Sequence, residues 1–300
     1  MQIDNERESD NVEDRRGEGG GGGGGGFGSE GGGGGNFAIG GRHIGIGTIV
    51  LALVAMYFGV DPRVVLNTAP TVMEAPSSNP AHAPPANDTG AKFVSKILAD
   101  TEDTWTEIFA QAGKQYVDPK LVLFTGVTRT ACGTGQAASG PFYCPGDQKV
   151  YIDLQFYQEL RDRFKAPGDF AQAYVIAHEV GHHVQNLLGI SAKVDQARHR
   201  ADEVQSNALS VKLELQADCF AGVWANHANT SRKILDSGDV EQGLTAASAI
   251  GDDTLQRETR GTVVPESFTH GSSAQRVRWF KRGIDSGDIN QCNTFKAAQL

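Results

Sequence analysis

The stretch that decides the fold and the chemistry of this chain is Ala177-His178-Glu179-Val180-Gly181-His182-His183. It contains the pattern H-E-x-x-H, with two histidines four residues apart. Residues four apart on a helix lie one turn above each other, so His178 and His182 can present their imidazoles to one cation. Glu179 lies beside them. The spacing therefore predicts a metal site on a helix.

The flanking sequence predicts that this helix runs from Asp169 to Leu188. Asp169 and Gln172 have the spacing of a capping box, and Gly189 is suited to end the helix. Gly181 costs roughly 1 kcal/mol of helix propensity, and its missing side chain predicts that another backbone, or a substrate, comes close there. The alternative interpretation is a core helix with two buried, hydrogen-bonded histidines and no metal.

Composition and charge exclude some functions. The net charge is -9 and the pI is near 5.4, and no basic, aromatic-interleaved patch is present, so nucleic acid is not expected as a partner. An even number of cysteines after an apolar segment predicts two disulfides in an oxidising compartment. The simplest pairing is Cys132 with Cys144 and Cys219 with Cys292, which is one of three connectivities. Four reduced, buried thiols are the alternative.

Shifts in composition predict four regions. Residues 1–36 mix acids and arginines and then run into glycine, which predicts a flexible arm. Residues 37–60 contain the uncharged run Ile44–Val60, which predicts one transmembrane helix in contact with membrane lipid. Residues 61–90 are rich in proline and predict an extended linker. Residues 91–300 are expected to form the folded domain.

The charges around the apolar run predict its orientation. Arg42 and His43 precede it and Asp61 follows it. The positive-inside tendency therefore places the amino terminus in the cytoplasm and the folded domain outside. A cleaved signal peptide is the main alternative.

Patterns within residues 91–300 predict an α+β domain that is mostly helical with a small antiparallel sheet. Helical periodicity occurs over 93–115, 155–165, 202–227, 241–259 and 274–282. Strand patterns occur over 121–124 and 149–154. We expect the second of these strands to offer a free edge to an extended peptide, with an ordinary edge strand as the alternative.

A catalytic zinc ion usually takes three protein ligands, so a third ligand must lie elsewhere in the chain. Glu214 and Asp218 are four residues apart on one face of the helix predicted over 202–227. Glu214 could complete a set with His178 and His182, and Asp218 could accept a hydrogen bond from the outer nitrogen of a ligand histidine. The alternative is a solvated acidic pair.

These motifs resemble a known family. The combination of H-E-x-x-H with Glu214-x-x-Ala217-Asp218 resembles the gluzincin metallopeptidases. The context over 177–185 and 214–222 resembles the bacterial neutral zinc metallopeptidase family, and the resemblance is thinnest in residues 1–36. It implies a minimal gluzincin-like domain behind one transmembrane helix at the inner membrane, on the periplasmic side. It also implies Zn²⁺ as cofactor, peptide substrates, and these roles: His178, His182 and Glu214 as ligands, Glu179 as general base and Asp218 behind a ligand histidine.

A further stretch, residues 268–277, resembles the T-H-P-x-x-x-x-R sequence of membrane-anchored gluzincins of the heat-shock and prenyl-protein protease type. Gly271 stands where those proteins have proline. The resemblance makes His270 or Arg276 a candidate to stabilise the oxyanion of the transition state. The alternative is that Thr269 caps a helix and Arg276 forms a structural ion pair.

The sequence thus predicts a membrane-anchored zinc metalloendopeptidase. Two functions of other classes remain as alternatives. One is a non-catalytic, zinc-containing binding module tethered to a membrane, which Glu179 disfavours because structural zinc needs no neighbouring base. The other is a structural envelope protein organised by its glycine-rich arm.

Overall fold

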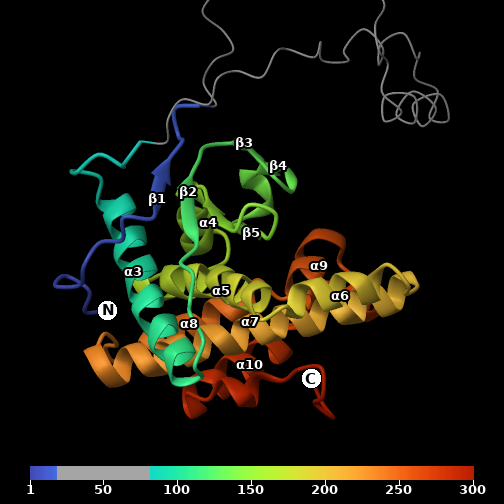
Figure 1. Ribbon diagram of the computed structural model, residues 1–300. Coiled ribbons are helices and arrows are strands. Elements are labelled where there is room, and N and C mark those ends of the chain that lie inside the picture. Colours follow the sequence, from blue (N-terminus) through green and yellow to red (C-terminus); the bar gives the residue numbers. More distant parts are fainter. Residues whose placement is uncertain (19–81) are drawn as a thin grey trace, which may run out of the picture. The chain divides into compact units, whose positions relative to one another are not determined.

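The computed structural model describes residues 1–18 and 82–300, and in this part of the chain the predicted metal-binding helix is α5, Asp169–Leu187 (Figure 1). Its N-cap is Gly168 and no side chain caps it, so the expected capping box is absent from this helix. Gly189 has φ +69°, a left-handed conformation that ends the helix as predicted.

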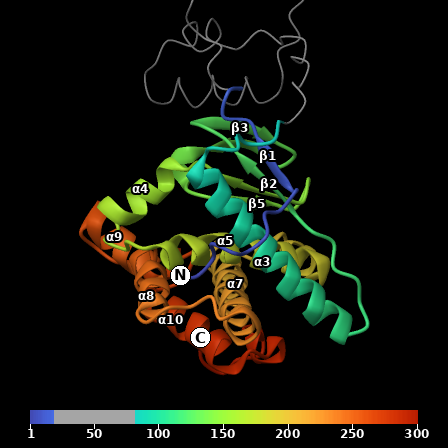
Figure 2. The same ribbon diagram turned by 90° about the vertical axis from the view of Figure 1, so that its left-hand side faces the viewer.

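The other helices cover most of the predicted helical segments. In chain order they are α3 (Thr89–Gln111), α4 (Gln155–Asp162), α6 (Ile190–Arg198), α7 (Glu203–Arg232), α8 (Asp239–Ala249), α9 (Asp252–Arg260) and α10 (Ser273–Ser286). Three short 3₁₀ helices are η1 (Ala137–Ser139), η2 (Pro265–Ser267) and η3 (Ile289–Cys292). The sheet lies on one side of α5, and α7, α8 and α10 lie on the other (Figures 1 and 2).

The four-stranded sheet is mixed, which corrects the expectation of a small antiparallel sheet. Its order is β1 (Val12–Asp14), β2 (Lys120–Leu123), β6 (Lys149–Ile152) and β5 (Phe142–Cys144). Only β5 is antiparallel to its neighbour. After β2 the chain forms a separate hairpin, β3 (Val127–Thr130) with β4 (Gly133–Gln136). It then returns as β5, so β6 enters the sheet parallel to β2.

Strand β6 has no free edge, because β2 and β5 pair with its two sides. The expectation that the strand at 149–154 offers a free edge is therefore wrong. Among the residues that the structure describes, no strand pairs with the other side of β5, so the open edge on this side of the sheet belongs to β5. A local hydrophobic pattern identifies a strand but does not determine its place in the sheet order.

Glycines allow α5, α7 and α10 to approach closely. A Cβ atom at Gly181 of α5 would lie 3.0 Å from the carbonyl oxygen of Ala217 on α7, so the predicted approach of another backbone is confirmed. On the opposite side of α7, a Cβ at Gly283 of α10 would lie 2.0 Å from the carbonyl oxygen of Cys219. Aromatic residues fill the surrounding core, where the ring of Phe170 stacks on that of Trp224 at 6.0 Å.

The expectation that residues 1–36 form a flexible arm is wrong for residues 1–18. Strand β1 pairs with β2, and Ser9 and Arg7 both bind the carboxylate of Glu102, which is 3% exposed. The amino group of Met1 lies 2.9 Å from the carboxylate of Asp236. The local composition suggests disorder here. It does not reveal that these polar side chains bind partners on distant elements.

The rest of the predicted arm, the predicted transmembrane helix and the linker up to residue 81 lie outside the described residues. Within residues 1–18 and 82–300, no helix has the length and apolar character needed to cross a membrane. After this gap the folded domain resumes with α3 at Thr89, slightly before the expected start at residue 91, because the side chain of Asp88 caps the helix.

The helix predicted over 241–259 is two helices, α8 and α9, with a break at Gly251. A Cβ at Gly251 would lie 2.4 Å from the backbone nitrogen of Ser273, so the break is also the point where α9 meets the start of α10. The predicted disulfides, Cys132–Cys144 and Cys219–Cys292, are both present.

We expect Gly283→Ala to lower the free energy of unfolding by about 1–3 kcal/mol, because the new methyl group forces α7 and α10 apart. This loss exceeds the roughly 1 kcal/mol that alanine gains in helix propensity. Urea unfolding of the full chain measures it. Gly90→Ala is the matched control, because the nearest atom to its Cβ is the end of a side chain, Leu154 Cδ1 at 3.2 Å. Equal stability of both variants would contradict the proposed tight contact.

Candidate metal centre

The two helices α5 and α7 bring together the three residues predicted as metal ligands. The Nε2 atoms of His178 and His182 lie 3.2 and 3.5 Å from the two carboxylate oxygens of Glu214. One donor atom from each residue lies within 4.8 Å of the others. Two imidazoles and one carboxylate are the donor set of many catalytic zinc sites, so the residues present fit Zn²⁺.

The electrostatics of this cluster favour a cation. Burial opposes a charge on His178, but Asp218 and Glu214 outweigh it and raise the pKa of His178 to about 10. Burial also opposes ionisation of Glu214, yet the two imidazoles hold the pKa of Glu214 well below its ordinary value. The carboxylates therefore stay ionised and attract positive charge, which a divalent ion would supply.

Asp218 lies behind His178 as the sequence predicts, and it is fully buried. Its Oδ1 atom lies 2.9 Å from Nδ1 of His178, which leaves Nε2 of that imidazole facing Glu214. Tyr174 also donates a hydrogen bond to Asp218. Burial would raise the pKa of Asp218, but Arg276 and His178 outweigh it and lower that pKa far below its ordinary value.

Arg276 belongs to this buried network. Its Nε and Nη2 atoms donate to the two carboxylate oxygens of Asp218 at 2.9 and 2.8 Å, and the residue is 2% exposed. The guanidinium thus lies at the Nδ1 side of His178, away from the nitrogen that faces Glu214. This geometry corresponds to the structural ion pair that was the alternative for Arg276, and it suits a positioning residue better than a group that contacts an oxyanion.

His270 lies at the rim of the same cleft, and Asp252 holds its loop. One oxygen of Asp252 accepts hydrogen bonds from the backbone nitrogens of Thr269, His270 and Gly271 at 2.7, 2.6 and 2.9 Å. The other oxygen lies 3.3 Å from Nδ1 of His270. The hydrogen bond with Asp252 raises the pKa of His270 against the effect of burial. The role of Asp252 could not be predicted from the sequence, where its only signal is a pair of acids directly after Gly251.

The backbone conformation explains why position 271 is glycine and not proline. Its φ is +92°, which proline cannot adopt because its ring fixes φ near −65°. The loop of this chain therefore differs locally from the T-H-P sequence that it resembles. His270 lines the cleft, and the backbone hydrogen bonds to Asp252 hold its loop.

A cleft of about 920 Å³ opens onto the cluster, and Glu179 lines it. Burial raises the pKa of Glu179, which suits a group that accepts and returns a proton. The cleft is also lined by His178, His182, Glu214, His270, Arg276, Phe142, Tyr143, Phe156 and Phe164.

Strand β5 forms one wall of this cleft, and His183 ties it to α5. Nε2 of His183 lies 2.6 Å from the carbonyl oxygen of Val117, so this nitrogen carries the proton. Nδ1 then accepts the hydrogen bond of the Tyr143 hydroxyl at 3.0 Å. His183 is fully buried, and burial lowers its pKa. His183, which follows the candidate ligand His182, thus fixes the open edge of the sheet beside the candidate ligands.

The chain belongs to a family described as "Putative neutral zinc metallopeptidase", whose model matches residues 1–295. This family implies Zn²⁺ as the cofactor. The chain is 52% identical over 295 residues to the uncharacterized protein YpfJ of Escherichia coli K12, covering 98% of this chain and 99% of the relative. It is 40% identical over 264 residues to the uncharacterized protein Rv2575 of Mycobacterium tuberculosis H37Rv, covering 82% and 86%. No solved structure matches.

We expect Asp252→Asn to lower the free energy of unfolding by about 1.5–3 kcal/mol at pH 7, because three hydrogen bonds to a charged oxygen become weaker hydrogen bonds to a neutral amide. The pKa of Asp252 is lower in the folded protein than its ordinary value, since hydrogen bonds from His270 and the loop outweigh burial. Its contribution is therefore present above about pH 4 and is lost as the pH falls below it. Denaturant unfolding from pH 7 to pH 3 should show parent and variant converging. Asp285→Asn, an exposed control, should change little.

Proposed function

We propose that this protein is a zinc-dependent endopeptidase whose base is Glu179. The observation that carries the proposal is the convergence of His178, His182 and Glu214 from two helices at the floor of a cleft that Glu179 also lines. Structural zinc sites are closed by four protein ligands, whereas this set of three faces a cleft.

Each side chain then has a defined task. The residues His178, His182 and Glu214 would hold the metal, and Zn²⁺ when bound polarises a carbonyl and lowers the pKa of water. Glu179 accepts the proton of the attacking water and returns it to the leaving amine. His270, with Nδ1 toward Asp252, donates a hydrogen bond to the oxyanion that develops in the transition state.

The open edge of β5 supports an extended peptide as the substrate. Main-chain groups of an edge strand can pair with a peptide backbone whatever its sequence. Phe142 and Tyr143 lie on this strand and line the cleft, so a peptide paired with β5 would pass the metal ligands. This mode selects extended or unfolded segments, because a folded protein does not offer a free strand.

We expect Glu179→Gln to bind one zinc ion per chain and to lose about 10²–10⁴-fold in kcat, because the amide cannot accept the proton. Zinc content and cleavage of an unfolded protein measure the two properties. His270→Ala should retain zinc and lower kcat by a smaller factor. Glu214→Ala is the control that should lose both zinc and activity. A Glu179→Gln variant that cleaves as fast as the parent would exclude Glu179 as the base.

For the location, we propose the outer face of a bacterial inner membrane, with the run Ile44–Val60 in contact with lipid. The two disulfides support an oxidising compartment. The side of the membrane that we propose for the amino terminus differs from the cytoplasmic side expected from the sequence. A single crossing between residues 18 and 82 would separate β1 from β2, which pair in one sheet. The backbone nitrogen of Asp14 also lies 2.8 Å from the carbonyl oxygen of His82. We therefore place residues 1–18 on the same side as the cleft.

A cysteine at exposed Glu8 and one at exposed Lys114 should react equally with a membrane-impermeant maleimide added to intact spheroplasts. Glu8→Cys reports on the amino-terminal segment, and Lys114→Cys reports on the domain. Labelling after lysis is the control for reactivity. Labelling of Lys114→Cys alone before lysis would contradict the shared side, and labelling of neither would contradict the extracytoplasmic location.

A further inference from the structure

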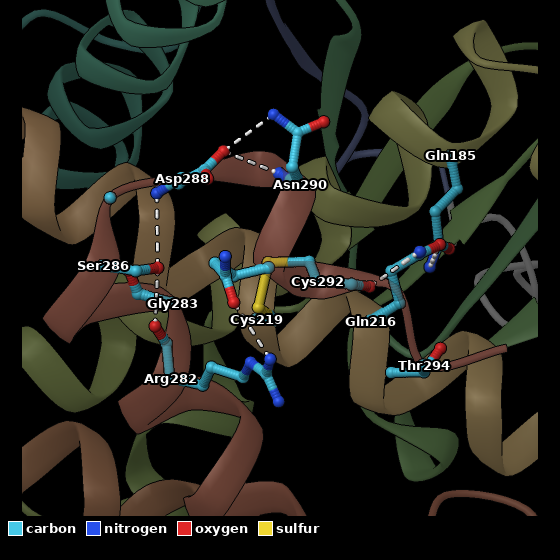
Figure 3. Close-up of a disulfide and its surroundings, with 12 residues drawn as sticks. Gln185, Gln216, Cys219, Arg282, Gly283, Ser286, Asp288, Asn290, Cys292 and Thr294 are labelled. Atoms are coloured by element: carbon cyan, nitrogen blue, oxygen red, sulfur yellow. Dashed lines mark hydrogen bonds between the residues drawn. A yellow bond between two sulfur atoms is a disulfide. The ribbon is translucent and has the colours of Figure 1, made fainter. Parts of the chain in front are cut away.

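Two buried glutamines connect the ligand His182 to the Cys219–Cys292 disulfide. Nδ1 of His182 lies 2.9 Å from Oε1 of Gln185. Nε2 of Gln185 lies 3.2 Å from Oε1 of Gln216, and Nε2 of Gln216 lies 2.9 Å from the backbone carbonyl oxygen of Cys292. Figure 3 shows Gln216 next to Cys292 of the disulfide, with the side chain of Gln185 extending toward Gln216. Gln185 is fully buried and Gln216 is 4% exposed.

Two backbone carbonyl oxygens, those of Cys292 and Leu213, determine which group donates in each hydrogen bond between His182 and Cys292. A carbonyl oxygen only accepts, so the amide nitrogen of Gln216 must face Cys292, and its Oε1 must face Gln185. The amide nitrogen of Gln185 also donates to the carbonyl oxygen of Leu213 at 2.7 Å. Oε1 of Gln185 is therefore left for His182. An oxygen acceptor at Nδ1 selects the tautomer with the proton on Nδ1 and the lone pair on Nε2, toward Glu214.

Covalent and polar contacts hold Cys292, the last partner in this series of hydrogen bonds. Cys292 is fully buried, and its disulfide joins η3 to Cys219 on α7, 73 residues earlier. The hydroxyl of Thr294 donates to the carbonyl oxygen of Lys212, also on α7, at 2.6 Å. The disulfide thus fixes the carbonyl that orients Gln216.

We propose that Gln185 and Gln216 are positioning residues that orient His182 for the metal. The hydrogen bonds from His182 through Gln185 and Gln216 to Cys292 form a relay, and the Cys219–Cys292 disulfide holds its far end in place. His178 and His182 are then oriented by different chemistry: His178 by the carboxylate of Asp218 and His182 by a neutral amide. The neutral relay fixes the ring without adding a further negative charge to a site that already contains Glu214. Loss of the disulfide frees the Cys292 carbonyl and weakens zinc binding while the site residues remain unchanged.

The second disulfide provides an internal comparison. Cys132–Cys144 joins the β3–β4 hairpin region to β5 and lies outside the Gln185–Gln216 chain of hydrogen bonds. If the disulfides act only through general stability, replacing either pair of cysteines by alanine should weaken zinc binding through partial unfolding. The relay predicts an effect of Cys219–Cys292 alone.

The test measures the zinc dissociation constant of the full chain by competition with a chelating dye, together with the Co²⁺ absorption spectrum and the unfolding midpoint of the metal-free protein. Outer partners of metal ligands typically contribute about 10–100-fold to affinity, so Gln185→Leu should weaken zinc binding by about that factor. Gln216→Leu and Cys219→Ala/Cys292→Ala should weaken it less, and all three should alter the Co²⁺ spectrum. Gln242 on α8 is partly buried, and its Oε1 accepts a hydrogen bond from the backbone nitrogen of Phe170 at 3.3 Å. Gln242→Leu and Cys132→Ala/Cys144→Ala are the matched controls and should bind zinc like the parent.

The proposed relay rests on the proposed metal site, but different results would overturn each of them. A parent protein that binds no zinc would overturn the proposed function. A parent that binds zinc, with Gln185→Leu and Gln216→Leu binding it within twofold, would overturn the relay alone. The relay is also overturned if both disulfide double variants weaken binding equally. If Gln185→Leu does not fold, Gln216→Leu and the two double variants still decide the question.

Discussion

The close packing of α5 on α7 is the constraint on which the rest of the structure depends. The absent side chain at Gly181 lets the backbone of Ala217 approach, and Ala217 lies between Glu214 and Asp218 on its helix. A wider spacing would withdraw both carboxylates from the imidazoles together. The donor set is thus determined by a packing contact, which explains why a poor helix former stands inside the metal-binding motif.

A buried carboxylate extends this constraint to a third helix. Asp218 has no exposure to solvent, and an unpaired charge there would be strongly destabilising. Arg276 of α10 supplies the paired charge, while Tyr174 and His178 of α5 supply hydrogen bonds. The same carboxylate therefore orients His178, a candidate ligand, and joins three helices, so the stability of the fold and the geometry of the site are not separable at this residue.

The sequence predicts the features that depend on local periodicity. The four-residue spacing of His178 and His182, and of Glu214 and Asp218, places each pair on one helix face, and the structure has those faces opposed. Features that depend on distant partners could not be predicted. Asp252 acts on the backbone of a loop seventeen to nineteen residues later. The three residues of β1 are too few and too polar to show a strand pattern, and the middle position of β6 follows from the sheet order alone.

The docked amino terminus also affects the order in which the fold can form during synthesis. Met1 binds Asp236, which is 235 positions later, and β1 must wait for β2 before it can pair. Until then the growing chain carries an unpaired strand, and the edge of β2 remains open to other chains once it appears. A translocated or nascent chain can therefore complete this sheet only when residues 12–14 and 120–152 have reached the same place, and contacts of such sequence separation make for slow folding.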